Sequence, residues 1–425
     1  MFSRRLKTGY FILEGLNSFA VVYFFYYLYF YMQKVYGFGN KANLALAAMN
    51  GGTYALTAWF GGRFAQRFGY FPALKLGFAV MALALGLGWA LDSVAGEILV
   101  MVLVVVGMSF TWPTLEALVS ENEPAAGLQH MIGVYNVVWA TTAAVGNFIG
   151  GAILDHLGLR SLFYVPLAVL SVQLGLTFWL ERRAGPPHLF RSPPGTEAVS
   201  LEVPGLAVGE VALSNPMATD LLVAQASQKL TKTQASGGLR KSRNFLSMAW
   251  LANPFAYIGI NTLIAVVPGV AHRLELSTMM AGFCCSAWCF ARLAAFALLW
   301  QWNGWHYRFR WLLVAYIMLT GSFVTILLVP NLVVLVLSQV LFGWAVGLLY
   351  YSSLFYSMDL SDTKGEHGGL HEAAIGLGNF AGPALGAAAL QFLPQYPHSG
   401  ALAVTLLLLC GLGGLTMIWR NGRSP

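Results

Sequence analysis

The chain has 425 residues, of which 57% are hydrophobic and 10% are charged. Soluble domains carry roughly 25% charged residues, so this composition excludes an ordinary soluble enzyme or binding domain and predicts a membrane protein. The formal net charge is +7, yet the basic residues are spread over short loops and form no continuous stripe, so we expect no nucleic-acid partner.

Twelve apolar stretches follow one another along the chain, and each is long enough for a transmembrane helix, which needs roughly 17–25 residues. Those of the first half lie at about 9–34, 42–64, 73–92, 97–118, 130–154 and 161–180. Those of the second half lie at about 246–271, 278–300, 311–329, 332–357, 367–391 and 400–419. We therefore predict an all-α membrane protein with twelve transmembrane helices in two six-helix bundles.

The region between the two sets, at about 184–243, is rich in Pro, Gly, Ser and Thr and is predicted to be a flexible cytoplasmic linker. A short amphipathic helix around Val208–Leu230 is the alternative for its middle part. The linker divides the chain into an N-terminal bundle over 1–183 and a C-terminal bundle over 244–425.

An amino terminus in the cytoplasm leaves few basic residues in the outer loops. Of 24 lysines and arginines, only Lys34, Lys41, Arg160 and Arg273 then lie outside, and Arg292 lies within a span. Because cytoplasmic loops carry the excess of Lys and Arg, this arrangement predicts a multi-pass protein of the inner membrane with both termini in the cytoplasm.

Two short motifs occur once in each half. Leu-Asn-Ser-Phe-Ala at 16–20 is echoed by Ala-Asn-Pro-Phe-Ala at 252–256, and Gly-Asn-Phe-Ile-Gly at 146–150 by Gly-Asn-Phe-Ala-Gly at 378–382. The first pair falls in helices 1 and 7 and the second in helices 5 and 11, as a duplicated six-helix unit requires. The glycines are expected to let helices pack closely.

The loop after the second span reads Gly-Arg-Phe-Ala-Gln-Arg-Phe-Gly-Tyr, and together with the six-plus-six arrangement it resembles the major facilitator superfamily. Gly62, Arg67 and Gly69 agree with the superfamily motif Gly-x-x-x-Asp-Arg-x-Gly-Arg, whereas Gln66 replaces the Asp and Tyr70 replaces the last Arg. The resemblance implies two pseudo-symmetric bundles that rock about a central substrate site. It also implies a gate between this loop and the start of helix 11.

In helix 11, Glu366 or Glu372 could meet Arg67 and the positive end of the helix dipole in place of the missing aspartate. His371, next to Glu372, favours a proton relay or a gate contact over a metal site, because no His-Glu-x-x-His pattern is present. The gate candidates are therefore Gly62, Gln66, Arg67, Gly69, Glu366, His371 and Glu372.

Charged residues deep within spans mark the expected substrate and coupling site. Arg292 lies roughly 12 Å from the cytoplasmic end of its helix, where a charge costs several kcal/mol unless it meets water, a counter-ion or a ligand. It is predicted either to clamp an anionic group of the substrate or to have a structural role, through a fixed ion pair with Glu372 or hydrogen bonds to helix carbonyls. Glu14 lies roughly 7 Å from the end of helix 1, and it is predicted either to carry a proton or to contact the gate.

Polar and aromatic residues of the central helices complete the candidate set, because ring faces and amides suit a ligand with both polar and apolar parts. The substrate or coupling candidates are Glu14, Asn17, Trp112, Asn136, Trp139, Tyr257, Asn261, Trp288, Arg292, Tyr350 and Tyr351. Trp302, Trp305 and Tyr307 are instead expected to form an interfacial belt.

These features predict a secondary active transporter that moves a small solute across the inner membrane by alternating access, coupled to an ion gradient that we expect to be of protons. Two alternatives rank below it: a non-transporting receptor or assembly factor on the same scaffold, and an intramembrane enzyme or lipid-handling protein that uses His371 and Glu372. No enzyme activity, cofactor or metal is predicted, because the sequence contains no nucleotide-binding loop or catalytic set, and its four cysteines lack disulfide or zinc spacing. The expected partners are the substrate, a coupling proton and lipid, and the chain is expected to act as a monomer.

Overall fold

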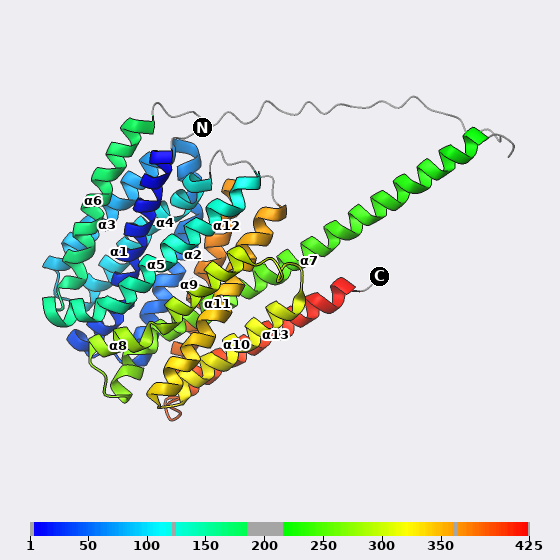
Figure 1. Cartoon of the computed structure of the whole chain (residues 1–425). Coiled ribbons are helices and arrows are strands. Elements are labelled where there is room, and N and C mark those ends of the chain that lie inside the picture. The colour runs from blue at the N-terminus through cyan, green and yellow to red at the C-terminus, as the bar shows by residue number, and fades with distance from the viewer. Residues whose placement is uncertain (1–3, 121–124, 185–215, 361–363, 424–425) are drawn as a thin grey trace.

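The computed structural model describes residues 4–120, 125–184, 216–360 and 364–423, with side chains over 6–119, 130–131, 133–184, 241–357 and 371–422. All regular elements within these ranges are helices (Figure 1). The helices of the first half are α1 (Arg4–Tyr36), α2 (Asn40–Phe68), α3 (Tyr70–Ala90), α4 (Val94–Ser120), α5 (Ala125–Leu157) and α6 (Ser161–Ala184). Those of the second half are α7 (Pro216–Arg273), α8 (Thr278–Cys285), α9 (Ala287–Gln301), α10 (Phe309–Leu328), α11 (Leu332–Leu360), α12 (Lys364–Phe392) and α13 (Ser399–Arg423).

The described helices cross the membrane twelve times. Eleven helical stretches within the described residues are long and apolar enough to span a bilayer, and α8 and α9 together form one of them. The twelfth crossing is α2, whose 29 residues extend over about 43 Å at 1.5 Å per residue. Helix α2 is less apolar than the other spans because it contains polar residues. One of them, Asn43, is buried and donates a hydrogen bond to the Tyr29 carbonyl. The prediction of twelve transmembrane helices is confirmed.

Helix α7 is longer than the span predicted at 246–271. It begins at Pro216, so part of the region predicted to be a flexible linker, 184–243, is helical. The Ala, Leu, Gln and Lys residues of this stretch are good helix formers, which explains the extension. Residues 185–215 lie outside the described residues, as does the first part of the alternative helix around Val208–Leu230, and the domain boundaries stay predictions.

The span predicted at 278–300 is confirmed as the apolar stretch Thr278–Gln301, but it consists of two helices with a break between them. The break lies at Ser286, between α8 and α9. The Tyr26 hydroxyl donates to the Cys285 carbonyl at 3.0 Å, and the Gln339 amide donates to the carbonyl one residue earlier at 2.8 Å. Carbonyl groups inside a membrane must be hydrogen-bonded, so these tertiary contacts make the break possible.

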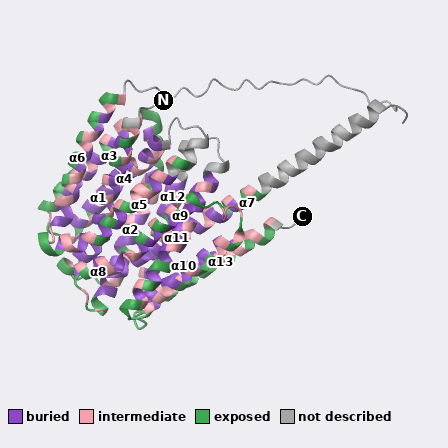
Figure 2. Cartoon of the chain, in the orientation of Figure 1, coloured by how far each residue is buried: buried purple, intermediate pink, exposed green. Residues whose placement is uncertain are grey.

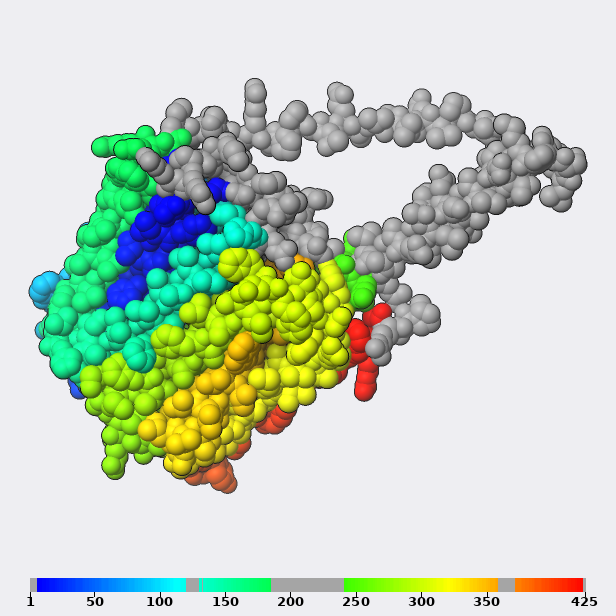
Figure 3. All heavy atoms as spheres, viewed as in Figure 1, coloured from blue at the N-terminus to red at the C-terminus, as the bar shows by residue number. Residues whose placement is uncertain are grey.

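Two sets of helices join the halves of the molecule. Helix α2 packs against α12, and α5 packs against α8 and α9. In the space-filling view, the teal of α5 lies beside the yellow-green of α8 and α9 (Figure 3). Within the first half, α1 packs on α5 and α6, and within the second half α11 packs on α9 and α10.

Glycines allow the helices of the two halves to approach closely. A Cβ atom on Gly51 of α2 would lie 2.3 Å from the carbonyl carbon of Asn379 in α12, and one on Gly376 would lie 2.6 Å from the α2 backbone. A Cβ on Gly151 of α5 would lie 2.2 Å from the Thr278 carbonyl oxygen in α8. No side chain fits at these distances, so both contacts between the halves depend on glycine.

The burial pattern agrees with a protein surrounded by lipid. Buried residues gather on the inner faces of the helices, while exposed ones lie on the outside (Figure 2). Large apolar side chains such as Leu56 and Leu83 are 71% and 70% exposed, and lipid would cover them. Trp305 is 2% exposed and packs on Phe355. It therefore belongs to the core, and its predicted place in an interfacial belt is wrong.

Candidate functional site

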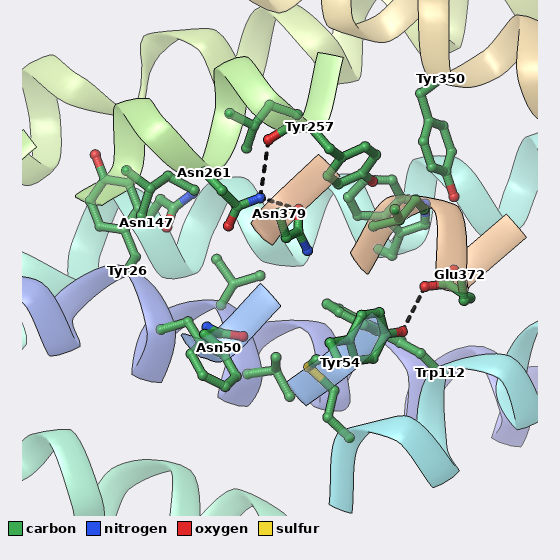
Figure 4. A pocket seen from close by; sticks show the side chains of 18 of the residues that line it. Tyr26, Asn50, Tyr54, Trp112, Asn147, Tyr257, Asn261, Tyr350, Glu372 and Asn379 are labelled. Carbon is green, nitrogen blue, oxygen red and sulfur yellow. Dashed lines mark hydrogen bonds between the residues drawn. The ribbon is translucent and has the colours of Figure 1, made fainter. Parts of the chain in front are cut away.

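A cavity of ≈ 160 Å³ lies between the two halves of the molecule. Helices α1, α2, α4 and α5 form one wall, and α7, α9, α11 and α12 form the other. Figure 4 shows side chains from both walls pointing toward one another across this space. The predicted candidates that line it are Glu14, Trp112, Trp139, Tyr257, Asn261, Trp288, Arg292, Tyr350 and Glu372.

Arg292 is the cation of this cavity, and it lies between two indole rings. Its guanidinium carbon is 4.5 Å from the ring centre of Trp139 and 4.7 Å from that of Trp288. The side chain is 6% exposed and its Nε has no hydrogen-bond partner among the described residues. The described residues contain no ion pair between Arg292 and Glu372. The alternative of a fixed ion pair is therefore wrong.

Glu372 is held by a tyrosine from the other half of the molecule. The Tyr54 hydroxyl on α2 donates to Glu372 Oε2 on α12 at 2.6 Å (Figure 4). Glu14 on α1 accepts a hydrogen bond from Ser18 Oγ at 2.8 Å. Glu116 of α4 and Glu372 are both close enough to Glu14 for their charges to interact with it. Glu14 and Glu372 therefore line the cavity, and Glu116 of α4 lies near both of them.

Asparagines from both halves line the rest of the cavity. Asn261 donates to the Tyr257 carbonyl at 3.4 Å and to Oδ1 of Asn379 (Figure 4). Asn147 donates to the Cys289 sulfur at 2.9 Å, and its Oδ1 has no partner among the described residues. The amide groups thus offer both donors and acceptors to a ligand.

Three predicted substrate candidates lie outside the cavity wall. Asn136 accepts a hydrogen bond from Trp139 Nε1 at 3.0 Å, so it positions a ring that contacts Arg292. Tyr351 packs on Phe296, with ring centres 6.0 Å apart. Asn17 is fully buried, and its amide has no partner among the described residues.

The predicted gate contact between Arg67 and Glu372, both among the described residues, is not formed. Gln66 and Arg67 are exposed at the end of α2, and the described residues contain no ion pair between Arg67 and Glu372. Gly62 lies in the same last turns of α2. Gly69 has φ 100° and joins α2 to α3, a conformation that favours glycine.

The remaining gate candidates lie on α12. The side chain of Glu366 lies outside the described residues. His371 is buried, and its Nδ1 is 3.5 Å from Ser353 Oγ. No group of metal-binding side chains is present within the described residues.

The cavity is separated from the side of the membrane opposite the amino terminus by contacts between the halves. The backbone N–H of Met279 donates to Asp155 Oδ2 at 2.8 Å. Lys41 Nζ donates to Gln391 Oε1 at 3.0 Å. These contacts join the ends of α5 and α8, and of α2 and α12.

A second closure lies on the side where α1 begins. The rings of His130 in α5 and Trp300 in α9 are 5.2 Å apart. Closer to the cavity, Trp139 packs on Phe296 with ring centres 5.6 Å apart. The halves are therefore in contact on both sides of the cavity.

The sequence pattern of the Major Facilitator Superfamily matches residues 10–293. The chain belongs to this superfamily. The superfamily resemblance inferred from the loop at 62–70 and from the helix arrangement is therefore confirmed. The tetracenomycin C resistance and export protein of Streptomyces glaucescens is 30% identical over 128 residues, which is 29% of this chain and 23% of that protein.

Two solved structures have the same superfamily fold over the whole chain. The nucleoside transporter NupG superposes with a TM-score of 0.66 at 14% identity, over 99% of this chain and 100% of that one. The human organic anion transporter MFSD10 superposes with a TM-score of 0.65 at 14% identity, over 98% and 100%. Family and fold together identify this superfamily member as a membrane transporter.

Sequence reasoning missed several residues that line the cavity of this superfamily transporter or lie at its edge. Tyr54, Asn147 and Asn379 are in the wall, and Glu116 interacts with the carboxyl groups there. Asn147 and Asn379 occupy the same position in the repeated Gly-Asn-Phe motif, so the repeat itself was the available signal. For Glu116, the signal was an acidic residue one helical turn after Trp112 within an apolar span.

Proposed function

We propose that this transporter is a secondary active transporter that moves a small solute through the central cavity by alternating access, coupled to protons. The observation that supports this best is the cluster of Glu14, Glu116 and Glu372 beside the cavity. Repulsion among three carboxylates falls when one of them binds a proton. A change of state that separates the three groups would therefore be linked to proton binding or release.

The bond between Tyr54 and Glu372 connects this cluster to the two halves. It runs from α2 to α12, so it breaks if these helices move apart. Glu372 would then lose its hydrogen-bond donor, and the proton affinity of its carboxyl group would change in the same step. The two sets of closing contacts, on either side of the cavity, support a mechanism in which one set opens while the other stays closed.

Membrane orientation and partners follow from the sequence. The excess of Lys and Arg on one side supports an inner-membrane protein with both termini in the cytoplasm. The named relatives carry different cargo, tetracenomycin C, nucleosides and organic anions, so they support transport of a small molecule without choosing one. Because all of them are transporters, the alternative of a receptor or assembly factor is not favoured.

The test uses the full chain, purified and reconstituted into liposomes that contain a pH-sensitive dye. Anionic, neutral and cationic compounds that do not cross empty liposomes are added in turn. At least one is expected to accumulate under an imposed proton gradient and to change the internal pH. Glu372→Gln should abolish the accumulation, because its amide cannot release a proton.

The matched control is Glu275→Gln, which makes the same chemical change at an exposed loop residue between α7 and α8. It should transport as the unchanged chain does. Accumulation of a solute with no proton movement would contradict the coupling, and equal activity of both variants would remove Glu372 from it.

A further inference from the structure

We propose that the central cavity binds a small aromatic molecule that carries one anionic group of the carboxylate type, with that group on Arg292 and the ring on the aromatic wall beside it. This inference rests on the proposed transport function and names the substrate class of the same site. It follows from four features of the cavity, namely the permanent charge of its unpaired cation, the carboxyl groups, the rings and the size.

Arg292 is a charged group of this cavity that has no ion-pair partner among the described residues. Arg292 is 6% exposed, has an unbonded Nε, and has no acidic partner among the described residues. The indoles of Trp139 and Trp288 attract its charge but supply no hydrogen-bond acceptor comparable to a carboxylate. A buried guanidinium is stabilised most by a planar anion that accepts two parallel hydrogen bonds.

The carboxyl groups of the cavity are partly bonded within the protein. Glu14 accepts a hydrogen bond from Ser18 and Glu372 accepts one from Tyr54, while Glu14 Oε2 has no partner among the described residues. A carboxyl group can become neutral by binding a proton, whereas the guanidinium of Arg292 keeps its charge. The permanent charge of Arg292 therefore favours an anionic ligand.

The rings around Arg292 suit an aromatic ligand. Trp139 and Tyr350 have ring centres 5.5 Å apart, and Tyr257 and Tyr350 are 6.3 Å apart. All three line the cavity together with Arg292, and Trp139 also contacts the guanidinium. A planar ring whose acidic group binds Arg292 would meet these faces and edges at the distances that aromatic pairs prefer.

The size of the cavity limits the ligand to about one ring. Its volume is ≈ 160 Å³, and an engineered protein cavity of about 150 Å³ holds one benzene molecule. A single ring with a short acidic substituent fits this space. A larger ligand would require the halves to move apart.

The first experiment measures binding to the unchanged full chain by thermal unfolding in detergent at neutral pH. The probes are benzoate, benzamide, benzylamine and cyclohexanecarboxylate. Benzoate is expected to bind roughly tenfold or more tightly than benzamide or benzylamine, as the loss of a hydrogen bond to a charged group predicts. It should bind roughly two- to tenfold more tightly than cyclohexanecarboxylate, which keeps the anionic group but lacks the aromatic contacts. Equal binding of benzamide overturns the anionic group, equal binding of cyclohexanecarboxylate overturns the ring, and tighter binding of benzylamine overturns the proposal as a whole.

The second experiment compares two arginine variants. Arg292→Gln should weaken benzoate binding by roughly tenfold or more while leaving benzamide unchanged. Arg310→Gln is the matched control, because Arg310 also lies over an indole, 5.3 Å from the Trp311 ring centre, but is exposed on α10. Unchanged benzoate binding by folded Arg292→Gln overturns the proposal. If that variant does not fold, the four probes on the unchanged chain still decide.

The two proposals fail in different ways. If benzoate binds as expected but no compound in the liposome panel moves with protons, the transport mechanism is wrong and the binding inference stands. If a neutral or cationic compound moves with protons while benzoate does not bind, the mechanism stands and the substrate class is wrong.

Discussion

Replacing Gly51 with alanine should push the two halves of the transporter apart. The added Cβ would lie 2.3 Å from the Asn379 carbonyl carbon, whereas ordinary contact begins at 3.4 Å. Helices α2 and α12 must therefore separate by about 1 Å, and such overpacking costs about 1–3 kcal/mol. Because the contact joins the halves, separating them relieves it. The equilibrium ratio of the closed to the open arrangement should fall by roughly 5- to 150-fold.

A cross-linking assay measures this shift. Cysteines in place of Lys41 and Gln391, whose side chains are hydrogen-bonded at 3.0 Å, report whether the ends of α2 and α12 are together. In a background with Cys410→Ser, which removes the exposed native thiol, a short bifunctional maleimide should link them more slowly in Gly51→Ala, by a factor of up to the change in that ratio.

Two glycine controls separate movement of the halves from loss of folding. Gly413→Ala adds a Cβ with no atom within 4 Å and should change nothing. Gly61→Ala places a Cβ 1.9 Å from the Ser109 carbonyl oxygen within the first half, where moving the halves gives no relief, so it should lower the melting temperature. An unchanged cross-linking rate in a Gly51→Ala protein with a normal melting temperature would refute the reasoning.

Three further predictions concern single hydrogen bonds or ion pairs. Tyr54→Phe removes the 2.6 Å donor to Glu372 and should destabilise the chain by about 1–3 kcal/mol. An unchanged melting temperature would show that this bond contributes nothing. Asp92→Asn removes an ion pair in which Asp92 is 71% exposed, so it should cost less than about 1 kcal/mol; a larger loss of stability would contradict its surface character. Tyr26→Phe removes the donor to the Cys285 carbonyl at the break in the eighth crossing and should speed maleimide labelling of this buried cysteine. An unchanged labelling rate would show that this hydrogen bond does not keep the break closed.

Much of the fold could be predicted because apolar length alone identifies a transmembrane helix. The eleven apolar stretches stand out in this way. The positions of Arg292 and Glu14 in the cavity wall also follow from the sequence, since a charged residue deep in a span is costly unless it faces an interior site.

Other features depend on tertiary contacts that no local pattern reveals. The break at Ser286 requires donors from Tyr26 and Gln339, which are distant in sequence. The pairing of Glu372 with Tyr54 required knowing which faces of α2 and α12 meet. Trp305 was placed at the interface because tryptophan is common there, but the neighbouring rings enclose it.

One face of α12 combines chemistry and packing. Glu372, Gly376 and Asn379 are spaced by four and three residues, so they lie along the same side of one helix. Glu372 accepts the bond from Tyr54, and the other two form the close contact with α2. An event at the carboxyl group and a displacement of the helix therefore take place on a single rigid body. Proton binding at Glu372 and movement of α12 therefore need no intermediate element to couple them. A mutation that uncouples them would have to distort the helix in the two turns from 372 to 379.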